Sequence, residues 1–173
     1  VQQNITELEV VLQAGAELPQ QSLPVDPSGV VYDVVSRDPV PGSVVTLAPA
    51  GACAGFDPAT SILNGGAGGY TIEGSSISMT VGTNGFYQFL FGPQSPARCD
   101  YTLRVAPPGS FSFPSQVIPA EGSTLSPPGA VGTTFEVQPN ATAPTAPVGP
   151  GTVYYLALTS GSATAGIVHN HIP

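Results

Sequence analysis

The sequence contains no lysine, and its arginines are limited to Arg37, Arg98 and Arg104. They stand against 11 acidic residues, which gives a net charge of -8 at pH 7. Binding to nucleic acid requires a basic patch that neutralises phosphates, and attraction to anionic lipid requires clustered Lys and Arg. The composition therefore predicts no nucleic-acid partner and no electrostatic attachment to a membrane.

Long apolar runs are also missing. No stretch reaches the roughly 18 uninterrupted apolar residues that a membrane span needs, so no membrane insertion is expected. Disordered chains combine low hydrophobicity with high charge, whereas this one is 41% hydrophobic and only 8% charged. Its 21 glycines and 20 prolines therefore indicate turns between many short strands. Because the chain lacks an initiator Met and a signal peptide, we expect Val1 to follow processing or excision from a longer chain.

Motifs for catalysis are absent as well. There is no G-x-S-x-G nucleophile elbow, and only two histidines are present to act as a base. The glycine run at 65–69 is followed by neither a helix pattern nor a lysine, which a phosphate-binding loop requires. Glu7 and Glu9 fit a solvated strand face better than a glycosidase pair. We predict no enzymatic activity and no cofactor.

The two histidines, His169 and His171, form an H-x-H pair that a strand would place on one face. A zinc or copper site needs at least a third ligand, and none lies nearby in the sequence. We therefore interpret the pair as part of a polar terminal strand or tail, and keep it only as a weak metal candidate.

What the sequence does contain is strand patterning, and it is clearest in residues 29–47, GVVYDVVSRDPVPGSVVTL. Val30, Tyr32 and Val34 alternate, a turn pattern covers residues 36–42, and a period of two restarts at Val44. This unit predicts strand, turn, strand. We place a β-sandwich domain at residues 29–173, preceded at residues 1–28 by an N-terminal strand and a Pro-rich linker.

Further short strands are expected along the rest of the domain, at residues 70–73, 77–81, 85–91, 99–106, 115–118, 133–138 and 152–159. Residues 167–172 are either a final strand or a tail. Residues 49–69 and 139–151 are expected to be long loops, and Asn84-Gly85 marks a tight hairpin turn. The pattern predicts an all-β, antiparallel, Ig-like sandwich with long Gly/Pro-rich loops.

The N-terminal extension has two interpretations. Leu8, Val10 and Leu12 alternate as in a strand, whereas Ile5, Leu8 and Leu12 also fit one face of a helix that Gly15 would cap. We favour the strand. The three prolines at 19, 24 and 27 then make residues 16–27 a linker or hinge.

The two cysteines, Cys53 and Cys99, are either buried free thiols or one disulfide. Both are flanked by residues typical of exposed ends of elements, so we favour the disulfide. Closing a loop of this size stabilises a fold by about 4 kcal/mol in the chain-entropy model. A disulfide would also imply an oxidising compartment.

The unit at 29–47, followed by TNGFYQFLF and DYTLRVAPPGSF, resembles the prealbumin-like β-sandwich modules of bacterial surface proteins. These include the B-type repeats of Gram-positive adhesins and their Gram-negative relatives, and the closing VHNHIP is similar to the end of the Gram-negative modules. The resemblance covers residues 29–113 well and the C-terminal third loosely. It implies a spacer, stalk or adhesive unit at the bacterial cell surface. Its partners would be neighbouring modules, identical subunits, a glycan or a host protein.

The chain departs from this family in two ways. Many Gram-positive relatives form a Lys-Asn isopeptide bond, which is impossible without lysine, and the cysteine pair could replace it. Some relatives bind calcium through an acidic turn, whereas residues 82–85 carry no carboxylate. The remaining aspartates lack the spacing of a calcium loop, namely Asp33, Asp38, Asp57 and Asp100.

Two further hypotheses compete with a stalk module. In the first, the chain is a filament subunit whose residues 1–13 complete the sheet of a neighbour, through a donor strand carrying Ile5, Leu8, Val10 and Leu12. In the second, it is a carbohydrate-binding module that uses exposed aromatics, with Tyr154 and Tyr155 as candidates. Because adjacent strand residues point to opposite faces, one of these two rings is expected to face outward.

Overall fold

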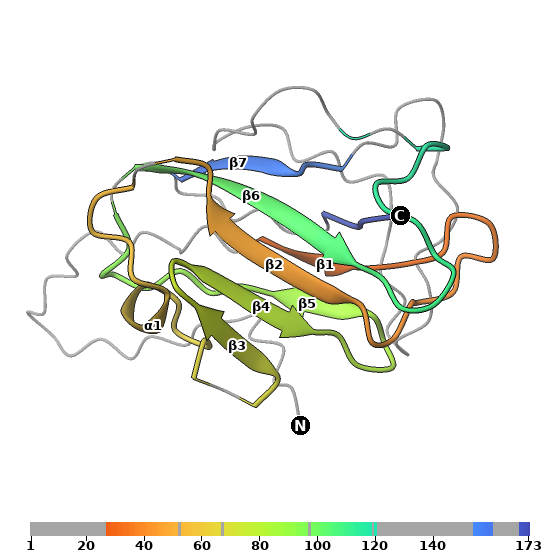
Figure 1. Ribbon diagram of the computed structural model, residues 1–173, viewed down its shortest axis with the longest axis horizontal. Coiled ribbons are helices and arrows are strands. Elements are labelled where there is room, and N and C mark those ends of the chain that lie inside the picture. The colour runs from red at the N-terminus through yellow and green to blue at the C-terminus, as the bar shows by residue number, and fades with distance from the viewer. Residues whose placement is uncertain are drawn as a thin grey trace, which may run out of the picture.

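The computed structural model describes residues 27–51, 53–66, 68–96, 98–118, 120, 154–160 and 170–173. Within them the chain forms seven strands and one single-turn helix (Figure 1). In chain order these elements are β1 (Ser28–Val30), β2 (Val44–Pro49), α1 (Pro58–Ser61), β3 (Tyr70–Glu73), β4 (Ser76–Thr80), β5 (Phe86–Gln88), β6 (Cys99–Ala106) and β7 (Ala157–Ser160). The protein is all-β, as the sequence predicted.

The strands form two antiparallel sheets that share one core. The larger sheet has the order β3-β4-β2-β6-β7, and the smaller one pairs β1 with β5. Figure 1 shows β1 and β5 behind the larger sheet. Buried side chains from both sheets belong to the same hydrophobic cluster, for example Leu47 and Leu103 from the larger and Val30 and Tyr87 from the smaller. The arrangement is therefore sandwich-like.

The centre of the larger sheet follows directly from period-two patterning. In β6 the residues Cys99, Tyr101, Leu103 and Val105 are buried, while the residues between them are exposed or half-buried. Leu47 of β2 lies opposite Leu103 in the register. A one-residue slip would turn every one of these apolar side chains to the other face, so the alternation fixes the pairing.

The last residues of the chain lie beside the first strand. Val31 and Ile172 form a parallel bridge, and three backbone hydrogen bonds join the two segments. The amide of Asn170 donates to Ser28 (2.8 Å), that of Ile172 to Val30 (2.9 Å), and that of Tyr32 to Ile172 (3.0 Å). Figure 1 shows this dark blue segment next to β1. Of the residues 167–172 expected to be a final strand or a tail, 170–172 are therefore paired with β1, and 167–169 lie outside the described residues.

The sequence-based boundaries hold best in the larger sheet. The strand expected at 99–106 is β6 with the same bounds, and that at 70–73 is β3. Two expectations are wrong. The loop predicted at 49–69 contains α1, which Asp57 caps by accepting a hydrogen bond from the amide of Ala59 (3.0 Å). Residues 115–118 are not a strand, because the amides of Val117 and Ile118 donate to Ser115 Oγ and form a turn. Residues 1–26 and 133–138 lie outside the described part.

Cys53 and Cys99 are joined by a disulfide, as predicted, with their Cα atoms 5.6 Å apart. The bond ties the loop before α1 to the start of β6. Disulfides are typical of proteins that work outside the cytoplasm. None of the helical residues described here forms a helix long and apolar enough to cross a membrane.

Candidate functional site

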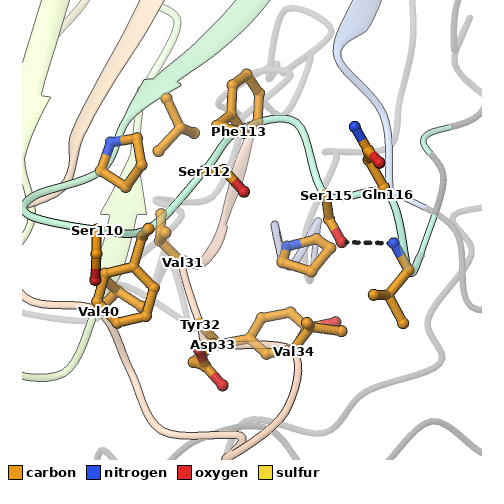
Figure 2. Close-up of a pocket in the computed structure, with 15 residues that line it drawn as sticks. Val31, Tyr32, Asp33, Val34, Val40, Ser110, Ser112, Phe113, Ser115 and Gln116 are labelled. Carbon is orange, nitrogen blue, oxygen red and sulfur yellow. Dashed lines mark hydrogen bonds between the residues drawn. The ribbon is translucent and has the colours of Figure 1, made fainter.

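A groove of about 440 Å³ lies beyond the ends of β1 and β6. Residues 31–34 form one wall, and residues 110–113 and 115–117 form another. The lining also includes Val40, Val105, Pro107 and Pro173. Figure 2 shows Tyr32 and Val34 facing this space on one side and Ser115 and Gln116 on another. The volume lies within the range of small-molecule and peptide sites.

The turn after Tyr32 is closed by hydrogen bonds from its backbone amides to the carboxylate of Asp33. Asp33 Oδ1 accepts hydrogen bonds from the amides of Val35 (2.8 Å) and Ser36 (2.6 Å). The Ser36 amide is the main reason why the pKa of Asp33 lies below its usual value, and the Val35 amide and the charge of Arg37 act in the same direction. Arg37 adopts a left-handed φ of 68° and places its guanidinium 5.6 Å from the centre of the Tyr32 ring. These two charges therefore shape the turn.

The opposite wall is held by a serine turn. Ser115 Oγ accepts from the amides of Val117 and Ile118, both at 3.3 Å, and the first of these bonds is drawn in Figure 2. Serine bonds of this kind replace regular strand pairing. The turn leaves the Val117 side chain exposed, and Phe111 on the same segment is half-exposed.

The groove has a neutral, mixed character. Its lining contains aromatic rings, valines and prolines together with serines and one glutamine, and Asp33 is its only charged residue. No group of three or more His, Cys, Asp or Glu gathers anywhere among the described residues. Such a surface is suited to an uncharged ligand with apolar and hydrogen-bonding groups.

The residues expected from sequence to form sites lie elsewhere. Tyr154 is 1% exposed, so of the two adjacent tyrosines it is the one that faces the core, and it drops out as a binding aromatic. Tyr155 is half-buried. His171 is buried, and its Nδ1 accepts a hydrogen bond from the amide of Val30 (3.0 Å). His169 and the proposed donor-strand residues Ile5, Leu8, Val10 and Leu12 lie outside the described residues.

The sequence interpretation missed the groove because three distant segments build it. A weak signal was present in residues 110–116, SFSFPSQ, where two phenylalanines stand among serines and a proline rather than in a strand. An aromatic residue in such a loop needs either a core to cover it or a partner. Phe113 packs against the core, whereas Phe111 does not belong to it.

Comparison of the chain with protein-family models, with curated proteins and with solved structures found no match. The fold and the disulfide define the class as an all-β, sandwich-like, disulfide-bonded protein.

Proposed function

We propose that this protein is a non-enzymatic structural module of a bacterial surface or secreted protein, acting as a spacer or stalk that bears tension. The observation that carries the proposal is the parallel pairing of the first and last described segments, Val31 with Ile172. When two parallel neighbours are pulled from opposite ends of the chain, they must slide past each other. All hydrogen bonds between them then resist together, rather than opening one after another.

Side chains reinforce this junction. His171 Nδ1 accepts from Val30 N–H, in addition to the three backbone bonds between the segments. The side chain of Asn170 donates through Nδ2 to Tyr87 Oη (3.1 Å) and to the Tyr155 carbonyl (2.9 Å). Its Oδ1 accepts from the backbone amide of Tyr155 (2.8 Å). Tyr87 Oη donates in turn to the Asn170 carbonyl (2.7 Å). Because both Asn170 and Tyr87 are buried, breaking these bonds leaves polar groups unsatisfied, which costs more than losing an exposed bond.

The disulfide adds a second form of resistance. Once the terminal segments separate, the chain between Cys53 and Cys99 still cannot extend. A stalk module exposed to repeated tension gains from this, because the segment that carries α1 and β3 to β5 stays tethered and can refold. The test is single-molecule force spectroscopy of the chain held at its two ends. The proposal predicts a distinct force peak that falls when His171 is replaced by Ala, and a wild-type chain that extends without a peak would contradict it.

A second candidate function is a filament subunit that donates residues 1–13 to a neighbour. A donor strand needs an open sheet edge, and β3 offers one. The Thr80 amide donates to the Gly69 carbonyl, so the peptide group of Gly69 faces β4. Because peptide groups alternate between the two sides of a strand, those of Tyr70 and Ile72 point away from β4. They make no backbone hydrogen bond within the described residues. Electron microscopy would test this: filaments lost on Leu8→Asp support it, and a chain that stays monomeric contradicts it.

The smaller sheet does not offer such an edge. Asn64 covers it, since its side chain accepts from the Leu90 amide (3.1 Å) and donates to the Gln88 carbonyl (3.2 Å). The Tyr70 hydroxyl donates to the same carbonyl (2.5 Å). These side chains occupy the positions that the backbone of an added strand would take. Between the edge of β5 and that of β3, donor-strand exchange would therefore use β3.

A further inference from the structure

We propose that the groove beyond β1 and β6 binds residues 18–25, LPQQSLPV, of a second copy of this chain placed head to tail. The site is distinct from the junction that bears tension, and the inference does not depend on the mechanical role. It assigns an interaction surface and a partner to this groove.

Exposed apolar side chains concentrate at the groove. The described residues include five large hydrophobic side chains with substantial exposure, and three of them flank this site: Val35 (85%), Phe111 (47%) and Val117 (73%). The other two, Leu63 and Ile72, lie near β3. Exposed apolar groups that gather at one concave surface indicate an interaction site, whereas single ones need no explanation.

The chemistry of the lining selects the occupant. Aromatic rings and prolines that line a groove are suited to a polyproline-type segment, whose rigid backbone loses little entropy on binding. The hydroxyls of Ser110 and Ser112 and the Gln116 amide can donate to its carbonyls. Asp33, the only charge in the lining, is engaged with the amides of its own turn. The occupant should therefore be extended, rich in proline and uncharged.

Residues 18–25 of this chain have these properties. Pro19 and Pro24 fix φ near the polyproline value, and the run contains no charged residue, although Glu17 and Asp26 flank it. Leu18 and Leu23 supply apolar side chains for the groove. The arm has other uncharged runs, at residues 1–6 and 10–16, but neither contains proline, so residues 18–25 are the only run there that is both uncharged and proline-containing.

The direction of the strands indicates which copy supplies the run. β1 and residues 170–172 run parallel, and both run toward the groove, where Pro173 lies in the lining. Pro27 stands before β1, at the opposite end. To reach its own groove, the arm of the same copy must therefore reverse direction at Pro27, whereas the arm of a copy placed head to tail extends toward the groove without turning back. This contact is heterologous, so one copy offers the groove and the next offers the arm.

The test is analytical ultracentrifugation, which measures the sedimentation of the full chain over a range of concentrations. The wild type should associate as concentration rises. A groove variant, Phe111→Ser with Val117→Ser, and an arm variant, Pro19→Ala, Leu23→Ser and Pro24→Ala, should each associate at least about tenfold more weakly, the effect of removing interface anchors. Leu63→Ser, an equally exposed apolar residue away from the groove, should behave as the wild type.

Mixing the two variants makes the test specific. The groove variant still has an intact arm, and the arm variant still has an intact groove, so an equimolar mixture should form a one-to-one complex. The proposal is overturned if the wild type stays monomeric at all concentrations, if the groove variant associates as the wild type does, or if the mixture forms no complex. Cross-linking of the arm to the groove within a monomer would also overturn it, since it would assign the arm to its own copy.

Discussion

The imidazole of His171 accepts a hydrogen bond from the amide of Val30, a residue 141 positions earlier in the chain, at 3.0 Å. The accepting atom is Nδ1, so the ring must be unprotonated at that nitrogen. The bond joins the beginning of the sandwich to its end.

Gly29 is predicted to be irreplaceable. A Cβ at this position would overlap the backbone carbonyl of Asn170, which cannot move without breaking the junction. We expect Gly29→Ala to destabilise the fold by about 2–3 kcal/mol, as overpacking does. Urea denaturation would measure the change. Gly51→Ala is the control, because a Cβ there meets nothing within 4 Å. Equal stability of the two variants would show that the close approach does not exist.

Reduction of the disulfide is predicted to lower the free energy of unfolding by about 4 kcal/mol, because the 46-residue separation of Cys53 and Cys99 makes the closed loop long. The measurement is denaturation with and without a reductant, compared with the Cys53→Ser, Cys99→Ser double variant. The variant should match the reduced protein and no longer respond to reductant. If the wild type is equally stable in both conditions, the bond does not contribute as proposed.

Stability should fall at high pH because burial disfavours ionisation of the tyrosine hydroxyls in the folded protein. Burial raises the pKa of Tyr70 from 10.0 to about 12, although its bond with Asn64 acts in the opposite direction. Burial also raises the pKa of Tyr87 and of Tyr32. A group whose folded pKa is higher than its unfolded one stabilises fully below the unfolded value. Stability should thus hold up to about pH 10 and decline toward pH 12.

Tyr70→Phe separates this effect from general alkaline damage. The variant loses the bond to the Gln88 carbonyl and should be about 1 kcal/mol less stable at neutral pH. It should then lose less stability than the wild type between pH 10 and pH 12. Parallel declines in the two proteins, measured by urea denaturation at each pH, would remove Tyr70 as a cause.

Asn64→Ala is predicted to open the edge of β5. Two hydrogen bonds of the side chain to that edge disappear, and we expect a loss of about 2 kcal/mol. Hydrogen exchange should show the amide of Leu90 losing protection. The amide of Phe89, which bonds the Pro27 carbonyl, should keep its protection. Unchanged exchange at Leu90 would mean that Asn64 does not cover the edge.

Local patterning predicted the elements whose partners lie on regular sheets. The alternation of residues 99–106 fixed β6, because every second side chain must reach the core. Single residues predicted structure less well than alternation did. Asp57-Pro58 is a good start for a helix, yet the glycines around it favoured a loop. Ser115 was placed in a strand because a serine turn and a short strand share the same composition.

The candidate site was less predictable. Its three segments are separated by up to about 140 residues, and no local pattern encodes their meeting. The pairing of Asn170 with Ser28 is of the same kind, since it depends on the folded positions of both ends. The two tyrosines show the limit most clearly: alternation predicted that one faces the core, but only the structure identifies it as Tyr154.

The most direct test of the structural role is force spectroscopy of the chain pulled from its two ends. We predict one force peak for separation of β1 from residues 170–172. His171→Ala should lower it, His171→Asn, which keeps an acceptor, should restore most of it, and Arg104→Ala on the outer face of β6 should leave it unchanged. Because an extended chain spans about 3.5 Å per residue, reducing the disulfide should release roughly 160 Å of further length. A wild-type chain that extends without a peak, or a His171→Ala chain with the wild-type peak, would contradict the account.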